Sequence, residues 1–152
     1  MTDREKNITL REMARAHGLC DKWYNEWSDD STLDECLDRF VRGFDFYVNT
    51  DFIPLDFARK NLDKELLHKH HIYIDEDINL EADSHGYYIF LGKCKGKFVV
   101  DGLWAVTVYV RHDSEIEIHS SNGARVFVTL YDDSMADCHQ DDWGIIKKQE
   151  KK

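Results

Sequence analysis

The sequence predicts an α+β protein, with a helical subdomain in residues 1–71 and a repeated-strand β subdomain in residues 72–152. Two patterns lead to this division. Apolar residues of the first part recur at intervals of three and four, as in amphipathic helices, and after residue 70 they alternate with polar residues, as in half-buried strands. From Ser84 onward the apolar positions also recur every ten residues, which indicates an internal repeat of strands.

We expect three to four helices in the first part. The stretch "NITLREMARAHG" has Thr9 as an N-cap, Glu12 in the capping-box position and Gly18 as a C-terminal stop. The stretch "LCDKWYNEW" that follows predicts a second, short helix with three aromatic residues close together.

The third helix has the clearest pattern, because a capping box at Thr32 and Glu35 precedes a continuous apolar stripe. The stripe comprises Leu33, Cys36, Leu37, Phe40, Val41, Phe44 and Tyr47. Such a stripe needs a partner surface. The stretch "PLDFARKNLDKELLHKHH" predicts a fourth helix that provides it, with Pro54 in the first turn.

The ten-residue repeat of the second part holds over six units. Its first inward slot contains Ser84, Cys94, Trp104, Ser114, Ala124 and Ser134. Its third inward slot contains Tyr88, Phe98, Val108, Ile118, Val128 and Cys138. Turn-forming residues separate the units, for example Gly92, Gly102 and Asn122 with Gly123.

Two architectures fit this period, a β-solenoid or β-roll-like stack and an antiparallel β-meander. The small residue that opens several repeats favours the solenoid, because a residue beside a tight corner has little room. The final stretch, "WGIIKKQEKK", predicts a C-terminal cap in which Trp143, Ile145 and Ile146 cover the last strand. A cap is expected because an open end exposes unpaired backbone groups.

Composition and charge exclude several classes of function. The chain has a net charge of −10 and neither half is basic, so we expect no nucleic-acid partner. The N-terminus is charged from its third residue, and no apolar run is long enough for a membrane span, so we expect no membrane partner either. The four cysteines are far apart, which predicts free thiols in a cytoplasmic protein.

Two stretches of the second part, "VYVRHDSEIEI" and "ARVFVTLYDD", resemble the C-terminal portion of small uncharacterised bacterial proteins encoded near mobile or prophage genes. The upstream stretches "LDRFVRGFDFYVNTDF" and "LDKELLHKHHIYID" are similar to the helical portion of the same proteins. The resemblance implies a helical N-terminal part, a C-terminal part of repeated strands and a phage-associated context. It implies no activity and no catalytic residues.

A helix-turn-helix DNA-binding protein is one alternative. The stretch "LREMARAHGLCDKWYNEW" matches two helices joined by a short turn at Gly18, with a recognition helix that starts near Cys20. That helix would present Asp21 and Glu26 to the groove. Because both residues repel phosphates, we favour a helical hairpin that packs on the long helix.

An enzyme or metal-binding protein is a second alternative, based on histidines. His68, His70 and His71 lie close together in sequence, but adjacent histidines point in different directions. In the region from His112 to His119, alternation places Glu115, Glu117 and His119 on one face of a strand. The same alternation also describes the solvated side of a sheet.

The function that we favour from sequence is a non-enzymatic binding protein that recognises a protein partner through the outward residues of the repeat. The predicted binding surface is Tyr109, Arg111, Glu115, Glu117, Arg125, Phe127 and Tyr131. The acidic chain favours a basic partner, such as a host protein bound by a phage-encoded inhibitor. We predict no cofactor, no metal ligands and no catalytic residues, and homo-oligomerisation stays open.

Overall fold

The computed structural model describes residues 1–43, 46 and 49–151, and it divides the chain into two compact units, Met1–His70 and His71–Lys152. The described part of the first unit contains the helices α1 (Asp3–Ala16), α2 (Asp21–Glu26), α3 (Leu33–Arg42), α5 (Leu55–Asn61) and α6 (Lys64–Lys69). The predicted fourth helix is therefore two helices, because Leu62 and Asp63 adopt extended backbone conformations between α5 and α6.

Helix α1 begins seven residues earlier than the sequence analysis predicted. Its N-cap is Thr2, whose hydroxyl accepts a hydrogen bond from Glu5 N at 3.2 Å, while the Glu5 carboxylate accepts from Thr2 N at 3.4 Å. Thr9 lies inside the helix and its hydroxyl donates to Glu5 O at 2.8 Å. The sequence contains two Thr-x-x-Glu patterns, and the helix extends back to the first because the intervening residues are compatible with a helix.

The apolar stripe of α3 is buried as predicted where the structure describes it. The Thr32 hydroxyl caps the helix by accepting from Glu35 N at 3.1 Å, and Leu33, Cys36, Leu37 and Phe40 are buried. Val41 is partly buried, and Phe44 and Tyr47 lie outside the described residues. Pro54 is the N-cap of α5 and does not lie in its first turn.

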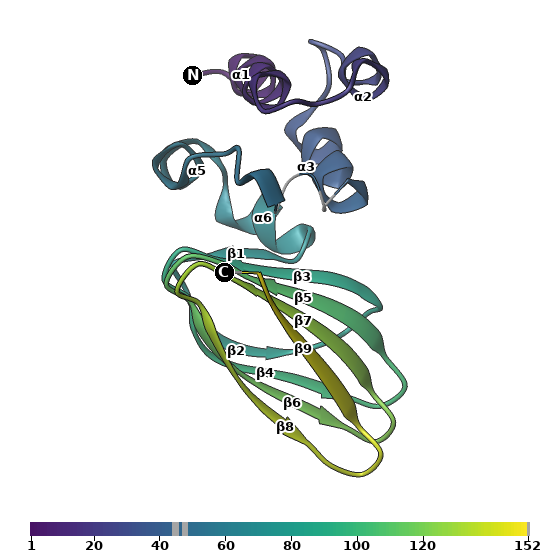
Figure 1. The fold of residues 1–152 in the computed structure, drawn as a ribbon. Helices are drawn as coiled ribbons and strands as arrows, with labels where there is room; N and C mark the ends of the chain where they lie inside the picture. Colours follow the sequence, from purple (N-terminus) through teal and green to yellow (C-terminus); the bar gives the residue numbers. More distant parts are fainter. Residues whose placement is uncertain (44–45, 47–48, 152) are drawn as a thin grey trace. The chain divides into compact units, whose positions relative to one another are not determined.

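The second unit is a β-solenoid, which confirms the favoured architecture. Its strands are β1 (Ile72–Ile74), β2 (Asp77–Glu81), β3 (Gly86–Leu91), β4 (Lys95–Asp101), β5 (Ala105–Val110), β6 (Glu115–Ser121), β7 (Arg125–Tyr131), β8 (Met135–Gln140) and β9 (Ile145–Lys151). They form a five-stranded sheet, β1-β3-β5-β7-β9, and a four-stranded sheet, β2-β4-β6-β8, that face each other (Figure 1). Every strand pair is parallel, which rules out the antiparallel meander.

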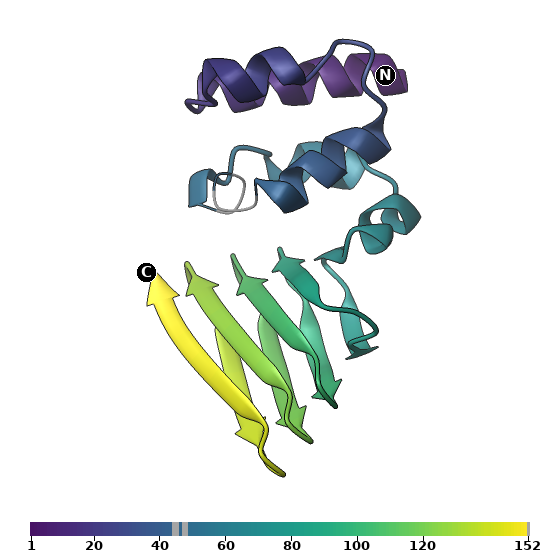
Figure 2. The same cartoon turned by 90° about the vertical axis from the view of Figure 1, so that its right-hand side faces the viewer.

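Successive strands alternate between the two sheets, so the ten-residue repeat corresponds to half a coil. The strands of successive coils lie side by side in each sheet (Figure 2). Residues that stack on one another are twenty positions apart, as in the column Val106, Val126 and Ile146. The first coil is shorter, since Ile72 pairs with Ile89 and Ile78 with Gly96. Each ten-residue slot therefore separates into two columns, one in each sheet.

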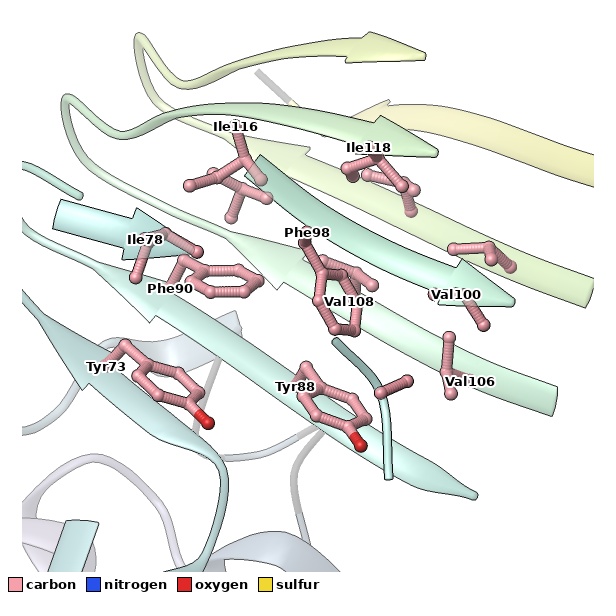
Figure 3. Close-up of a cluster of buried hydrophobic side chains, with 14 of the residues drawn as sticks. Tyr73, Ile78, Tyr88, Phe90, Phe98, Val100, Val106, Val108, Ile116 and Ile118 are labelled. Carbon is pink, nitrogen blue, oxygen red and sulfur yellow. The ribbon is translucent and has the colours of Figure 1, made fainter. Parts of the chain in front are cut away.

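The core of the solenoid lies between the two sheets, where the inward side chains of both meet (Figure 3). Tyr88, Phe90 and Phe98 fill the wide first coils, with ring centroids 4.7 Å apart for Tyr88 and Phe98. Smaller residues such as Val108 and Ile118 fill the coils that follow. The predicted third slot is buried from Tyr88 to Val128 and becomes partly exposed at Cys138.

The small residues at one corner of the solenoid bind the preceding coil through their side chains. Ser114 Oγ donates to Gly92 O at 3.0 Å and accepts from Cys94 N at 3.1 Å. One coil later, Ser134 Oγ lies 2.9 Å from Val110 O of the preceding coil as a donor and accepts from Tyr131 N of its own coil at 3.1 Å. The slot therefore selects small residues for hydrogen bonding as well as for space, since buried backbone groups at a corner need partners.

The predicted C-terminal cap is wrong, because Ile145–Lys151 continues the repeat as strand β9. Trp143 is 92% exposed in the turn before it, and only Ile146 packs against the core. The next inward positions of β9 are charged, since Lys148 pairs with Val128 and Glu150 with Leu130. Charged residues at core positions end the apolar columns and disfavour further stacking on this strand.

Substitution of Gly96 by alanine should destabilise the solenoid strongly. Gly96 has a φ of +142°, and a Cβ atom there would lie 2.0 Å from the backbone oxygen of Ile78. Gly86→Ala is the matched control, because Gly86 has a φ of +117° but nothing within 4 Å of the added atom. We expect the free energy of unfolding to fall by about 3 kcal/mol or more in Gly96→Ala and by about 1–2 kcal/mol in Gly86→Ala. Urea unfolding followed by far-ultraviolet circular dichroism measures both values. Equal losses would contradict the close approach of β2 and β4.

The thiols should differ in their reactivity with dithionitrobenzoate. Cys20 is exposed, whereas Cys36 and Cys94 are buried, and burial raises the pKa of both buried thiols. Because the thiolate is the nucleophile, we expect Cys20 to react first, Cys138 more slowly, and the buried pair only after denaturation. The Cys20→Ser variant should lose the fast phase. A fast phase that survives in this variant would show that a second thiol is accessible.

Candidate functional site

The predicted binding residues do not form one surface, because consecutive strands belong to opposite sheets. Glu115 and Glu117 lie on β6 in the four-stranded sheet. Arg125 and Phe127 lie on β7 in the five-stranded sheet. The sequence analysis grouped them because it assumed that neighbouring ten-residue units stack directly on each other.

Tyr109 and Tyr131 are buried, at 7% and 5% exposed, although they were predicted as accessible outward residues. Their rings belong to a row with Tyr87, with centroid distances of 6.5 Å and 6.4 Å. The Arg111 guanidinium covers the Tyr131 ring at 4.7 Å and its Nε lies 3.1 Å from an Asp132 carboxylate oxygen. These mutual contacts leave the tyrosines little surface to offer a partner.

An exposed group of apolar and basic residues lies on the outer side of the last strands of the five-stranded sheet. We define the β7–β9 patch as Arg125, Phe127, Trp143, Ile145 and Lys147. In the register of the sheet, Arg125 pairs with Ile145 and Phe127 with Lys147. Phe127 is 49% exposed, and Trp143, in the turn before β9, is exposed and has a positive φ of 68°.

The most closely packed group of potential ligand atoms lies on the outer side of the four-stranded sheet. We define the His–carboxylate cluster as Glu117, His119, Asp137 and His139. Glu117 pairs with Asp137 and His119 with His139 in the register of β6 and β8. The two imidazole rings stack with centroids 4.7 Å apart and planes inclined by 14°.

Distances within the cluster are short. His119 Nε2 lies 3.3 Å from Glu117 Oε2, and His139 Nε2 lies 3.7 Å from Glu117 Oε1 and 3.1 Å from Asp137 Oδ2. The sequence analysis named Glu117 and His119 but missed Asp137 and His139. The sequence does contain a pattern that indicates them. An acidic residue, an apolar residue and a histidine occur as "EIH" at residues 117–119 and again as "DCH" at residues 137–139, twenty positions later.

The other histidine candidates serve separate structural contacts. His70 Nε2 lies 2.8 Å from an Asp34 carboxylate oxygen, and hydrogen bonds from Lys69 and His70 lower the pKa of Asp34. His71 stacks on Tyr88, with centroids 4.2 Å apart. These two histidines therefore do not converge on one ligand.

His112 occupies a corner of the solenoid and does not lie beside Glu115 or His119 on the sheet face. Its backbone has a positive φ of 63°, and its Nδ1 accepts a hydrogen bond from Gly92 N at 3.0 Å. The His112 backbone N–H in turn donates to Asp132 Oδ2 at 3.1 Å. This side chain links successive coils at their turns.

The helix that would read DNA in the helix-turn-helix alternative is short. Helix α2 has six residues, which gives it a length of about 9 Å. Asp21 at its start is paired with Arg15, and Arg11 of α1 binds Tyr24 O and Asp29. These basic side chains are therefore engaged within the helical unit, which weighs against their use on phosphates.

The helical unit also contains an apolar pocket of about 360 Å³. Its described lining includes Trp23, Trp27, Phe40, Phe46 and Phe52. Arg39, at the same pocket, donates to Glu26 O at 2.9 Å and to Ser31 Oγ at 3.2 Å.

No helix within the described residues has both the length and the apolar character that crossing a bilayer requires. In comparisons of this chain with known proteins, no family model, no curated protein and no solved structure matches it. The resemblance to proteins encoded near mobile or prophage genes therefore stays a prediction.

Proposed function

We propose that this chain is a non-enzymatic binding module that recognises a protein partner through the β7–β9 patch. The observation that carries the proposal is the exposure of three large apolar side chains on adjacent strands of one sheet and the turn before β9, namely Phe127, Ile145 and Trp143. Exposed apolar groups rimmed by polar residues are typical of protein-binding surfaces. Tryptophan, arginine and other large side chains also contribute most to binding energy in such interfaces.

The sheet supports this role because it holds the patch in a fixed arrangement. Adjacent parallel strands are about 4.8 Å apart, and hydrogen bonding along β7 and β9 fixes which side chains are neighbours. A partner therefore meets a preorganised row of residues, and little conformational entropy is lost on binding.

The local charge of the patch favours an acidic surface on the partner. Arg125 and Lys147 both face solvent, and neither forms an ion pair within the part of the chain that the structure describes. The sequence analysis expected a basic partner from the overall charge of −10. On the opposite sheet, however, Glu115 already lies 3.5 Å from Lys95, and Glu117 belongs to the His–carboxylate cluster. We therefore propose that the partner contributes an apolar contact for the patch, and that carboxylates of the partner surround this contact.

Alanine substitution of Phe127 and Trp143 should weaken binding to a partner captured from the producing cell. The partner is identified by mass spectrometry, purified and titrated against the chain by calorimetry. We expect each substitution to raise Kd by about tenfold or more, because exposed aromatic anchors lose most of their contact area. Arg125→Glu should have a similar effect that diminishes at high salt, because it reverses a charge at the rim.

Met135→Ala is the matched control, because Met135 is 59% exposed but lies on β8 in the other sheet. Its Kd should equal that of the unmodified chain. Loss of binding in this variant, or unchanged binding in the Phe127→Ala/Trp143→Ala double variant, would contradict the assignment. If sedimentation shows that the chain alone dimerises through Phe127 and Trp143, the occupant is a second copy and the proposed acidic partner is wrong.

A further inference from the structure

We propose that the His–carboxylate cluster is a binding site for a divalent transition-metal ion, with zinc as the ion that its ligands suit best. The site is independent of the β7–β9 patch, since Glu117, His119, Asp137 and His139 lie on the four-stranded sheet. Among the described residues, Glu117, His119 and His139 form a group whose ligand atoms all lie within 4.8 Å of one another.

The solenoid brings the four side chains together through register and alternation. Positions 117 and 119 point to the same side of β6 because successive side chains of a strand alternate. Parallel pairing then places Asp137 beside Glu117 and His139 beside His119. The outcome is a square of two carboxylates and two imidazoles on adjacent strands.

The spacing of the ligand atoms is close to that of a tetrahedral zinc site. Zinc bonds to nitrogen and oxygen of about 2.0–2.1 Å imply ligand atoms about 3.3 Å apart along the edges of the tetrahedron. The three contacts given above, from His119 to Glu117 and from His139 to Glu117 and Asp137, measure 3.3, 3.7 and 3.1 Å. Glu117, His119 and His139 therefore already place three ligand atoms within 4.8 Å of one another, and Asp137 becomes the fourth ligand if its carboxylate turns toward them.

The arrangement of charges favours a bound cation. Glu117 and Asp137 are directly opposite each other, and like charges at such positions destabilise a sheet. The next column of the same face differs, because Lys95 is opposite Glu115 and the two charges are 3.5 Å apart. Lys97 lies on the other side of Glu117 but forms no ion pair with it in the described part of the chain. A dication between the carboxylates removes their repulsion.

His119 supplies a further sign of a missing partner. Its Nε2 atom is inaccessible to solvent and makes no hydrogen bond within the described residues, although Glu117 Oε2 is 3.3 Å away. A buried ring nitrogen without a hydrogen bond is unfavourable, and coordination would satisfy it. Two imidazole nitrogens also select zinc, copper or nickel over calcium and magnesium, which prefer oxygen ligands.

A bound ion would join strand β8 to β6. Most residues of β8 are exposed, and this strand is the last of the four-stranded sheet in the described chain. Coordination by His119 of β6 and His139 of β8 together would fix one coil to the next without any addition to the core. Ions that bind only the folded state stabilise it by mass action.

Zinc binding to the chelator-treated full chain provides the test. Equilibrium dialysis should find about one zinc ion per chain, and calcium or magnesium should not displace it. The His119→Ala/His139→Ala double variant should lose about a hundredfold or more in affinity, and Glu117→Gln about tenfold. Co²⁺ substituted for zinc provides an absorption signal that reports nitrogen and oxygen ligands directly.

Glu115→Gln is the matched control, because Glu115 lies on the same face of β6, two residues from Glu117, and outside the cluster. It should bind zinc like the unmodified chain. Because His139 is about half exposed, the variants should keep the far-ultraviolet spectrum of the native fold. Absence of stoichiometric zinc binding, or equal binding by the double variant, would overturn the proposal and, in the second case, place the ion on other histidines.

Discussion

The twenty-residue register of the parallel sheets is the constraint on which the rest of the solenoid depends. After the shorter first coil, the pairing of parallel strands makes residues twenty positions apart neighbours, on the core side and on the solvent side alike. The core columns, the corner hydrogen bonds of Ser114 and Ser134 and the two surface groups all follow from it. A shift of one residue would turn every inward side chain outward, so burial and register maintain each other.

This constraint gives the two outer faces of the solenoid different chemistry. On the four-stranded sheet, charged and imidazole side chains of β6 and β8 are matched in columns, and most of them have a partner on the neighbouring strand. On the five-stranded sheet, the rings of Tyr87, Tyr109 and Tyr131 contact one another near the ends of β3, β5 and β7, whereas Phe127 of β7 and Ile145 of β9 are exposed. The composition of a surface group therefore depends on which sheet a ten-residue unit enters, and consecutive units cannot contribute to the same face.

The helices, the strands and the inward positions could be predicted from sequence because local period and burial determine them. The length of a coil could not be predicted, because a ten-residue period fits both a short coil of ten residues and a coil of twenty residues with two equal halves. This explains why Glu115 and Phe127 were grouped and why Asp137 and His139 were missed. The start of α1 was missed for another reason, because Thr2 and Thr9 both begin a capping-box pattern and only the extent of the helix distinguishes them. Tyr109 is buried and contacts Tyr87 of the neighbouring strand, and a contact between residues so far apart in sequence is not contained in any local pattern.

The composition of the solenoid core changes from the first coil to the last, and this change bears on the two surface groups. The core changes from aromatic residues in the first coils to valine and isoleucine, and then to Cys138, Lys148 and Glu150 at inward positions. Apolar burial per coil therefore falls toward β8 and β9, and the last strands gain less stability from the core than the first. Each surface group includes one of these last strands, β8 in the His–carboxylate cluster and β9 in the β7–β9 patch. A ligand bound at either group would stabilise the last strands, which gain little stability from the core. Binding and the stability of the last coil should therefore be coupled.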